Sequence, residues 1–120
     1  KKASGTPGLG RYRGEDTVEL GAQNRKYTHY LNRLRQQIES RWEYPPEAYA
    51  KKKTGTAVLQ FSIAGDGNLL NTVILSSSGF EDLDSGALTV VRAAAPYDPL
   101  PEQFNLSRLN IVARFQYDIF

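Results

Sequence analysis

Residues 57–76 read AVLQFSIAGDGNLLNTVILS, and this stretch decides the fold. Apolar side chains occupy every second position of its first part, at Ala57, Leu59, Phe61 and Ile63. That period of two is typical of a strand with one buried face. Residues 65–68, GDGN, supply the positive-φ residues of a tight turn. The stretch therefore predicts a β-hairpin, with a second strand over roughly residues 69–76.

Downstream of the hairpin, the apolar period changes to that of a helix. The stripe comprises Leu83, Ala87, Val90, Val91 and Ala94, and Pro96 ends it. After a proline-containing loop, a last strand alternates again, with Leu109, Ile111, Ala113, Phe115 and Tyr117 on its core side. A right-handed crossover through the helix places this strand beside the first strand of the hairpin. The expected sheet order is 2-1-3, with the last strand at an edge.

Upstream of the hairpin, a second amphipathic helix is expected. Its apolar stripe comprises Tyr27, Tyr30, Leu31, Leu34, Ile38 and Trp42. It should run for about five turns and end at Tyr44-Pro45-Pro46. The predicted fold is α+β: a two-layer sandwich of a three-stranded sheet with both helices on one face. Residues 1–22 are assigned to the end of a flexible linker and residues 23–120 to the folded domain.

Composition limits what this domain can do. A chain of 120 residues suits one domain, and a net charge of +2 gives no field typical of a nucleic-acid binder. Without cysteine there is neither a disulfide framework nor thiolate chemistry. No apolar run approaches the ~20 residues that span a bilayer, and no signal-peptide pattern begins the sequence.

Residues capable of catalysis or metal binding do not form a recognisable set. His29 is the single histidine and falls opposite the apolar stripe of its helix. Glu81, Asp82 and Asp84 could be paired carboxylates, but stabilising a helix N-terminus explains them more simply. The expectation is a binding domain that is not an enzyme and has no cofactor or metal.

The order of several short motifs resembles the C-terminal domain of TonB-type energy transducers. The resemblance covers residues 44–120 and rests on Tyr44-Pro45, residues 55–63, Gly65-Asp66-Gly67, residues 74–79, Leu83-Asp84, Ala87-Leu88, Pro96, Pro99-Leu100-Pro101 and the closing strand. Gly86 departs from the family, which more often has Ala there. Because Gly in a helix interior costs up to ~1 kcal/mol, we expect a close packing contact at Gly86. The helix before Tyr44 also looks like the start of TolA-type domains.

The resemblance implies a periplasmic domain that an N-terminal helix, absent from this sequence, anchors to the inner membrane. An ExbB–ExbD-like motor driven by the proton gradient would act on that anchor. The domain would grip the TonB box of an outer-membrane transporter by adding a strand to its own sheet. A TolA-like scaffold that binds envelope proteins without driving transport is the alternative. An exposed edge strand allows either a monomer or a strand-swapped homodimer.

This reading assigns partner binding to two places in the sequence. Tyr44 and Pro45 stand where the family has its Tyr-Pro motif, although Tyr44 could instead close the core. The other expected contacts are the residues of the last strand that alternate with its core side chains: Asn110, Val112, Arg114 and Gln116. There the main chain of an added strand would provide affinity and side-chain pockets would provide selectivity.

Overall fold

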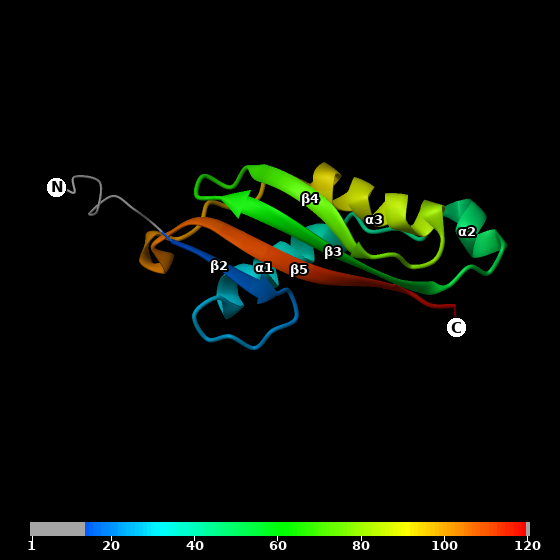
Figure 1. Cartoon of the computed structure of the whole chain (residues 1–120), viewed down its shortest axis with the longest axis horizontal. Coiled ribbons are helices and arrows are strands. Elements are labelled where there is room, and N and C mark those ends of the chain that lie inside the picture. The colour runs from blue at the N-terminus through cyan, green and yellow to red at the C-terminus, as the bar shows by residue number, and fades with distance from the viewer. Residues whose placement is uncertain (1–13, 120) are drawn as a thin grey trace.

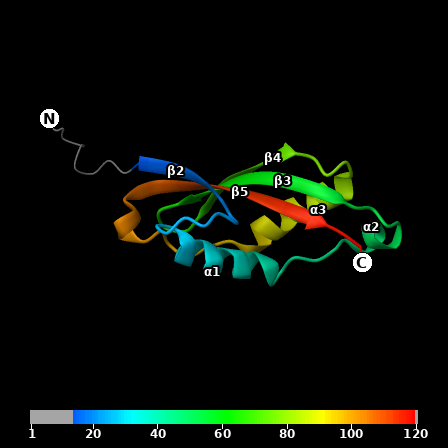
Figure 2. The same cartoon turned by 90° about the horizontal axis from the view of Figure 1, so that it is seen from below.

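The structure, a computed structural model, describes residues 14–119. Its elements are β2 (Gly14–Glu19), α1 (Thr28–Glu39), α2 (Pro46–Ala50), β3 (Gly55–Ala64), β4 (Leu69–Ser76), α3 (Glu81–Ala94), a short 3₁₀ turn (Glu102–Phe104) and β5 (Leu106–Tyr117). The strands form one sheet in the order β2-β5-β3-β4 (Figure 1). α1 and α3 lie on the same side of it, and α2 lies near the end of β5 (Figure 2). The predicted α+β two-layer fold is confirmed.

The hairpin and the crossover are also as predicted. β3 pairs antiparallel with β4 on one side and antiparallel with β5 on the other. Gly67 has a φ of 94° in the hairpin turn, a conformation that glycine adopts without strain. The Gly67 carbonyl also accepts a hydrogen bond of 2.9 Å from the Tyr97 amide, which fixes the loop after α3 against the turn.

The prediction of three strands was wrong, because β2 adds a fourth. It pairs parallel with β5, from Gly14 beside Leu106 to Glu19 beside Val112. Residues 14–19 belong to the stretch assigned to the linker, and residues 1–13 of that stretch lie outside the described residues. β2 was not predicted because Val18 is its only apolar side chain, so the strand shows no alternating apolar pattern. A polar edge strand of this kind is held mainly by the main-chain ladder, which leaves little pattern in the sequence.

The first helix is shorter than predicted. α1 ends at Glu39, and Trp42 lies beyond it in the connection to α2. The amides of Ser40 and Arg41 still bond to the carbonyls of Gln36 and Ile38, closing the last turn. Trp42 nevertheless packs onto the sheet, with its ring 5.5 Å from that of Phe115. The helical period therefore extended past the helix because the core continues beyond it.

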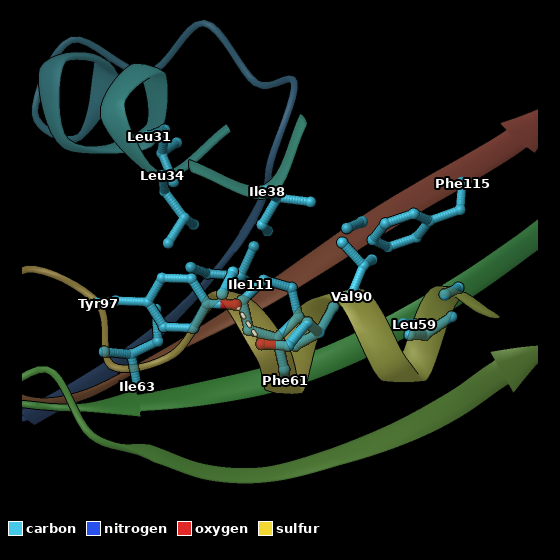
Figure 3. Close-up of a cluster of buried hydrophobic side chains, with 14 of the residues drawn as sticks. Leu31, Leu34, Ile38, Leu59, Phe61, Ile63, Val90, Tyr97, Ile111 and Phe115 are labelled. Atoms are coloured by element: carbon cyan, nitrogen blue, oxygen red, sulfur yellow. Dashed lines mark hydrogen bonds between the residues drawn. The ribbon is translucent and has the colours of Figure 1, made fainter. Parts of the chain in front are cut away.

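One core joins the two layers. Figure 3 shows Leu34 and Ile38 of α1 in one cluster with Val90 of α3 and the β5 residues Ile111 and Phe115, and all five are buried. The core-facing set predicted for the last strand is confirmed, since Leu109, Ile111, Ala113, Phe115 and Tyr117 are all buried. This helix layer covers one face of β5, and in the described part of the chain the opposite face of the strand carries no helix.

Candidate partner-binding edge

The sequence predicts that β5 is an edge strand along its whole length, and this is wrong for its first part. β2 covers its first part, from Leu106 to Val112. Within residues 14–119, no strand pairs with residues 113–117 on that side. The predicted edge therefore exists only over the last part of β5, which we call the open segment (residues 113–117).

Backbone direction along the open segment follows from one hydrogen bond. The Leu20 amide donates to the Val112 carbonyl at 2.8 Å, so the polar groups of Val112 point toward β2. Since these groups alternate sides along a strand, those of Arg114 and Gln116 point the same way, past the end of β2. Phe115 points its own groups toward β3, where it pairs with Ala57. The open segment thus presents the N–H and C=O groups of Arg114 and Gln116 to an incoming strand.

A pocket of about 330 Å³ lies beside the open segment, between β5, the end of β2 and α1. Ile38, Trp42 and Phe115 supply its apolar walls, and its charges come from Arg35, Arg114, Glu19 and Glu39. The remaining lining residues are Leu20, Gly21, Ala22, Val112 and Ala113. An apolar side chain on a strand added to β5 has room in this pocket, and its charged neighbours could meet flanking polar residues.

An aromatic cluster closes the end of the open segment. The Tyr117 ring lies 5.4 Å from Trp42 and 5.3 Å from Tyr44, both edge to face. The Tyr44 hydroxyl donates to the Lys53 carbonyl, and its ring also contacts Tyr49 at 5.3 Å. Burial raises the pKa of the Tyr117 hydroxyl, with the nearby Trp42 indole opposing the shift. Tyr44 is therefore half-buried and part of the packing at the end of the sheet.

Pro45 supports the same end from the helix side. A Cβ placed on Gly86 of α3 would lie 3.1 Å from the Pro45 Cγ and 3.5 Å from the Tyr117 hydroxyl. The close packing contact predicted for Gly86 is thereby confirmed. It explains why a residue without a side chain stands in the middle of α3, where alanine would favour the helix.

The predicted site residues separate into two groups. Tyr44, Pro45, Arg114 and Gln116 gather around the open segment and the aromatic cluster. Val112 pairs with Glu19, the last residue of β2, and Asn110 pairs with Thr17 of β2. All four residues of β5 point away from the helices, as expected, but Asn110 is buried rather than exposed.

Asn110 is buried because it bonds to both neighbouring strands. The Ser62 hydroxyl of β3 donates to the Asn110 Oδ1 at 2.6 Å. The Asn110 Nδ2 donates to the Glu15 Oε1 and the Thr17 Oγ1 of β2, each at 3.2 Å. Ser62 and Asn110 are the two buried polar residues of the described range. This row of polar side chains crosses the helix-free face of the sheet.

Several residues of the site were missed from the sequence. The sequence predicts only a core role for Ile38 and Trp42 and a linker over residues 19–22, whereas both groups line the pocket. The one available signal was that Val18 and Leu20 alternate with polar residues before Gly21, a weak strand-and-turn pattern.

The residues weighed for catalysis have structural roles. Glu81, Asp82 and Asp84 occupy the first turn of α3. Asp82 accepts a 3.0 Å hydrogen bond from Lys53, which lowers the pKa of its carboxyl. Among residues 14–119, no group of three or more His, Asp or Glu side chains could hold a metal ion. No helix of that range has the length and apolarity required to cross a bilayer.

Comparison with known proteins matches this architecture to one family. The family model of the Gram-negative bacterial TonB protein C-terminal region matches residues 40–119. Protein TonB of Pasteurella multocida is 36% identical over 89 residues, covering 74% of this chain and 32% of that protein. Protein TonB of Haemophilus influenzae is 32% identical over 91 residues, covering 76% of this chain and 31% of that protein. The chain thus spans about a third of these relatives.

Solved structures show the same fold. The TonB C-terminal domain of Helicobacter pylori superposes with a TM-score of 0.67 at 22% identity, covering 83% of this chain and 96% of that one. TolAIII, solved bound to a peptide derived from the N-terminus of TolB, superposes with a TM-score of 0.58 at 20% identity, covering 83% of this chain and 80% of that one. From the match over residues 40–119 and the identity to two TonB proteins, this chain belongs to the TonB C-terminal domain family.

Proposed function

We propose that this chain is the partner-binding domain of a TonB-type transducer, and that it binds the TonB box of an outer-membrane transporter as an added strand on β5. The observation that carries the proposal is the open segment. Arg114 and Gln116 there direct main-chain groups away from β3, past the end of β2. An extended peptide satisfies such groups without any rearrangement of the core.

Selectivity would come from the pocket beside the open segment. Alternate side chains of an added strand point toward the helices and toward the free face. Those on the helix side meet Ile38, Trp42 and Phe115, and burying one there contributes about 1.5–3 kcal/mol. Arg35 and Arg114 offer positive charge at the rim, and Glu19 and Glu39 offer negative charge.

The wider role follows from the family. We propose that the domain works in the periplasm and is joined to an inner-membrane anchor outside this sequence. Through that anchor an ExbB–ExbD-like motor would couple the proton-motive force to the transporter. The domain would catalyse no reaction and would need no cofactor, since its contribution is to hold a strand. The proposed role is compatible with either a monomer or a strand-swapped homodimer.

A proline substitution in the open segment tests strand addition. In Arg114→Pro the lost N–H points away from β3, so the sheet keeps its ladder and the protein should fold. The probe is a synthetic TonB-box peptide from an outer-membrane transporter, with affinity measured by calorimetry. We expect at least tenfold weaker binding, because one main-chain bond is lost and the carbonyl of the peptide that accepted it is left unpaired.

Two further variants separate the causes. Arg114→Ala removes the side chain but keeps the N–H, so it should bind more tightly than Arg114→Pro. Phe115→Pro removes an N–H directed to β3 and a buried ring, so it should destabilise the fold by at least about 3 kcal/mol. If folded Arg114→Pro binds the peptide as wild type does, strand addition at the open segment is wrong. If a peptide from a soluble periplasmic protein binds and no TonB box does, the TolA-like scaffold role is favoured.

A further inference from the structure

The place next to the open segment is already filled by a strand of this chain. β2 runs parallel to β5 and covers it up to Val112, the residue before the open segment begins. The open segment offers only Arg114 and Gln116 for main-chain pairing on this side. An added strand that is longer than this segment must therefore meet β2.

β2 is attached to the domain at few points. Val18 is its single buried residue, and the pairing with β5 is irregular between Gly14 and Glu15. Its link to the helix layer includes one hydrogen bond, from the Tyr27 hydroxyl to the Asp16 Oδ2 at 2.7 Å. Burial, together with this carboxylate, raises the pKa of Tyr27 to about 12, so the hydroxyl remains a donor at neutral pH. The rest of the attachment is the main-chain ladder with β5 and the side chains of Ser107 and Asn110, which donate hydrogen bonds to β2.

On the free face, β2 is recognised by Asn110. The Ser62 hydroxyl bonds to the Asn110 Oδ1, which turns the Nδ2 toward the neighbouring strand. The Nδ2 then donates to oxygen atoms of Glu15 and Thr17. Any strand in this place that carries a carboxylate or hydroxyl opposite Asn110 can replace these acceptors. An apolar strand would leave the amide facing it without an acceptor, at a cost in binding.

We propose that β2 occupies, within the chain, the place on β5 that a longer partner strand takes, so that partner binding is a strand exchange. Asn110 and Tyr27 are then specificity-determining residues, which favour an extended parallel segment with oxygen-bearing side chains where Asp16 and Thr17 now lie. This inference rests on the proposed strand addition and extends it to the covered part of β5. A strand tethered in cis competes at an effective concentration of about millimolar, which sets a threshold for partner affinity.

The probe is a synthetic peptide with the sequence of residues 14–20, GEDTVEL, added to the full chain. Since the Leu20 amide points to β5, the amides of Val18 and Asp16 do so too, and that of Glu19 points away. Asp16→Pro therefore removes both a ladder donor and the acceptor for Tyr27, and should release β2. Glu19→Pro is the matched control, because it removes an outward N–H from the same strand.

We expect the peptide to bind Asp16→Pro at least tenfold more tightly than it binds wild type or Glu19→Pro. A peptide with valine in place of its threonine should bind Asp16→Pro at least threefold more weakly, because one Asn110 acceptor is gone. Asp16→Ala is the milder second variant, should Asp16→Pro fail to fold; β2 then lacks the acceptor for Tyr27 while the peptide keeps its own, so affinity shifts in the same direction. Equal binding to wild type, Asp16→Pro and Glu19→Pro, or binding to none of them, overturns the inference.

Hydrogen exchange of the Val18 and Leu20 amides separates this inference from the proposed function. A TonB-box peptide that binds wild type and speeds their exchange supports both. If it binds while those amides stay protected and Asp16→Pro leaves its affinity unchanged, strand exchange is wrong and strand addition stands. If only the GEDTVEL peptide binds Asp16→Pro, the exchange site is supported and the assignment of the transporter as partner is wrong.

Discussion

Replacing Asp84 by Asn should weaken the hydrogen bonds that join the end of the hairpin to the first turn of α3. The Asp84 carboxylate accepts hydrogen bonds from the Ser78 amide at 2.8 Å, the Ser78 hydroxyl at 2.7 Å and the Ser77 hydroxyl. No side chain caps α3 at Phe80, so this carboxylate is what ties residues 77–78 to the helix. Asn keeps one acceptor oxygen and turns an NH₂ group toward the other donors.

The magnitude follows from these bonds. Hydrogen bonds to a charged group contribute about 1.5–3 kcal/mol each, and the half-exposed position of Asp84 places it at the low end. We therefore expect Asp84→Asn to lower the free energy of unfolding by about 2 kcal/mol, which for a domain of this size lowers Tm by roughly 10 °C. Glu81→Gln is the control, because it removes the same charge from the same helix turn and should cost about 0.3–1 kcal/mol.

The effect should also depend on pH. Partial burial raises the pKa of Asp84, but the hydrogen bonds from Ser77 and Ser78 outweigh it and hold the pKa below its usual range. A lowered pKa means that the ionised carboxyl stabilises the fold above the unfolded pKa of about 3.9, and that this stability is lost as pH falls through the folded pKa. Denaturant unfolding at pH 7 and at stepwise lower pH measures the gap between wild type and Asp84→Asn. The reasoning fails if that gap is the same at pH 7 and pH 3, or if Glu81→Gln costs as much.

Three other substitutions test the packing around the site. Gly67→Ala places a Cβ against the Tyr97 carbonyl at a φ of 94°, so chemical denaturation should show a loss of about 3 kcal/mol or more. Gly86→Ala gains up to ~1 kcal/mol of helix propensity but presses on Pro45, so its stability should stay within about 1 kcal/mol of wild type; a loss as large as that of Gly67→Ala would mean that Pro45 cannot shift. Tyr44→Phe loses the bond to the Lys53 carbonyl and should cost about 1 kcal/mol. Tyr44→Ala also loses the ring against Tyr117 and should cost about 2 kcal/mol while weakening TonB-box binding; unchanged affinity of the folded variant would limit Tyr44 to packing.

The hairpin, the crossover helix and the core face of β5 could all be predicted from the amino-acid sequence. Each of these elements buries one side, so its apolar residues recur with a period of 2 in the strands and 3.6 in the helix. The turn at Gly67 and the close contact at Gly86 could be predicted for a related reason. Gly67 has a positive φ that other residues adopt only with strain, and a glycine in a helix interior, as at Gly86, costs helix stability and so points to a close neighbour.

Which part of β5 lacks a neighbouring strand on the β2 side could not be predicted from the sequence. β2 takes its place through main-chain bonds, an Asn110 amide and one buried valine, and main-chain pairing with a distant segment has no signature in either strand's sequence. Trp42 likewise kept the helical period of α1 although the helix ends before it, because the ring fills the core from a connecting segment. The sequence identified which residues of β5 face away from the helices. Some of these residues pair with β2 and others lie beside the pocket. This division depends on contacts between segments about 90 residues apart, which the sequence does not show.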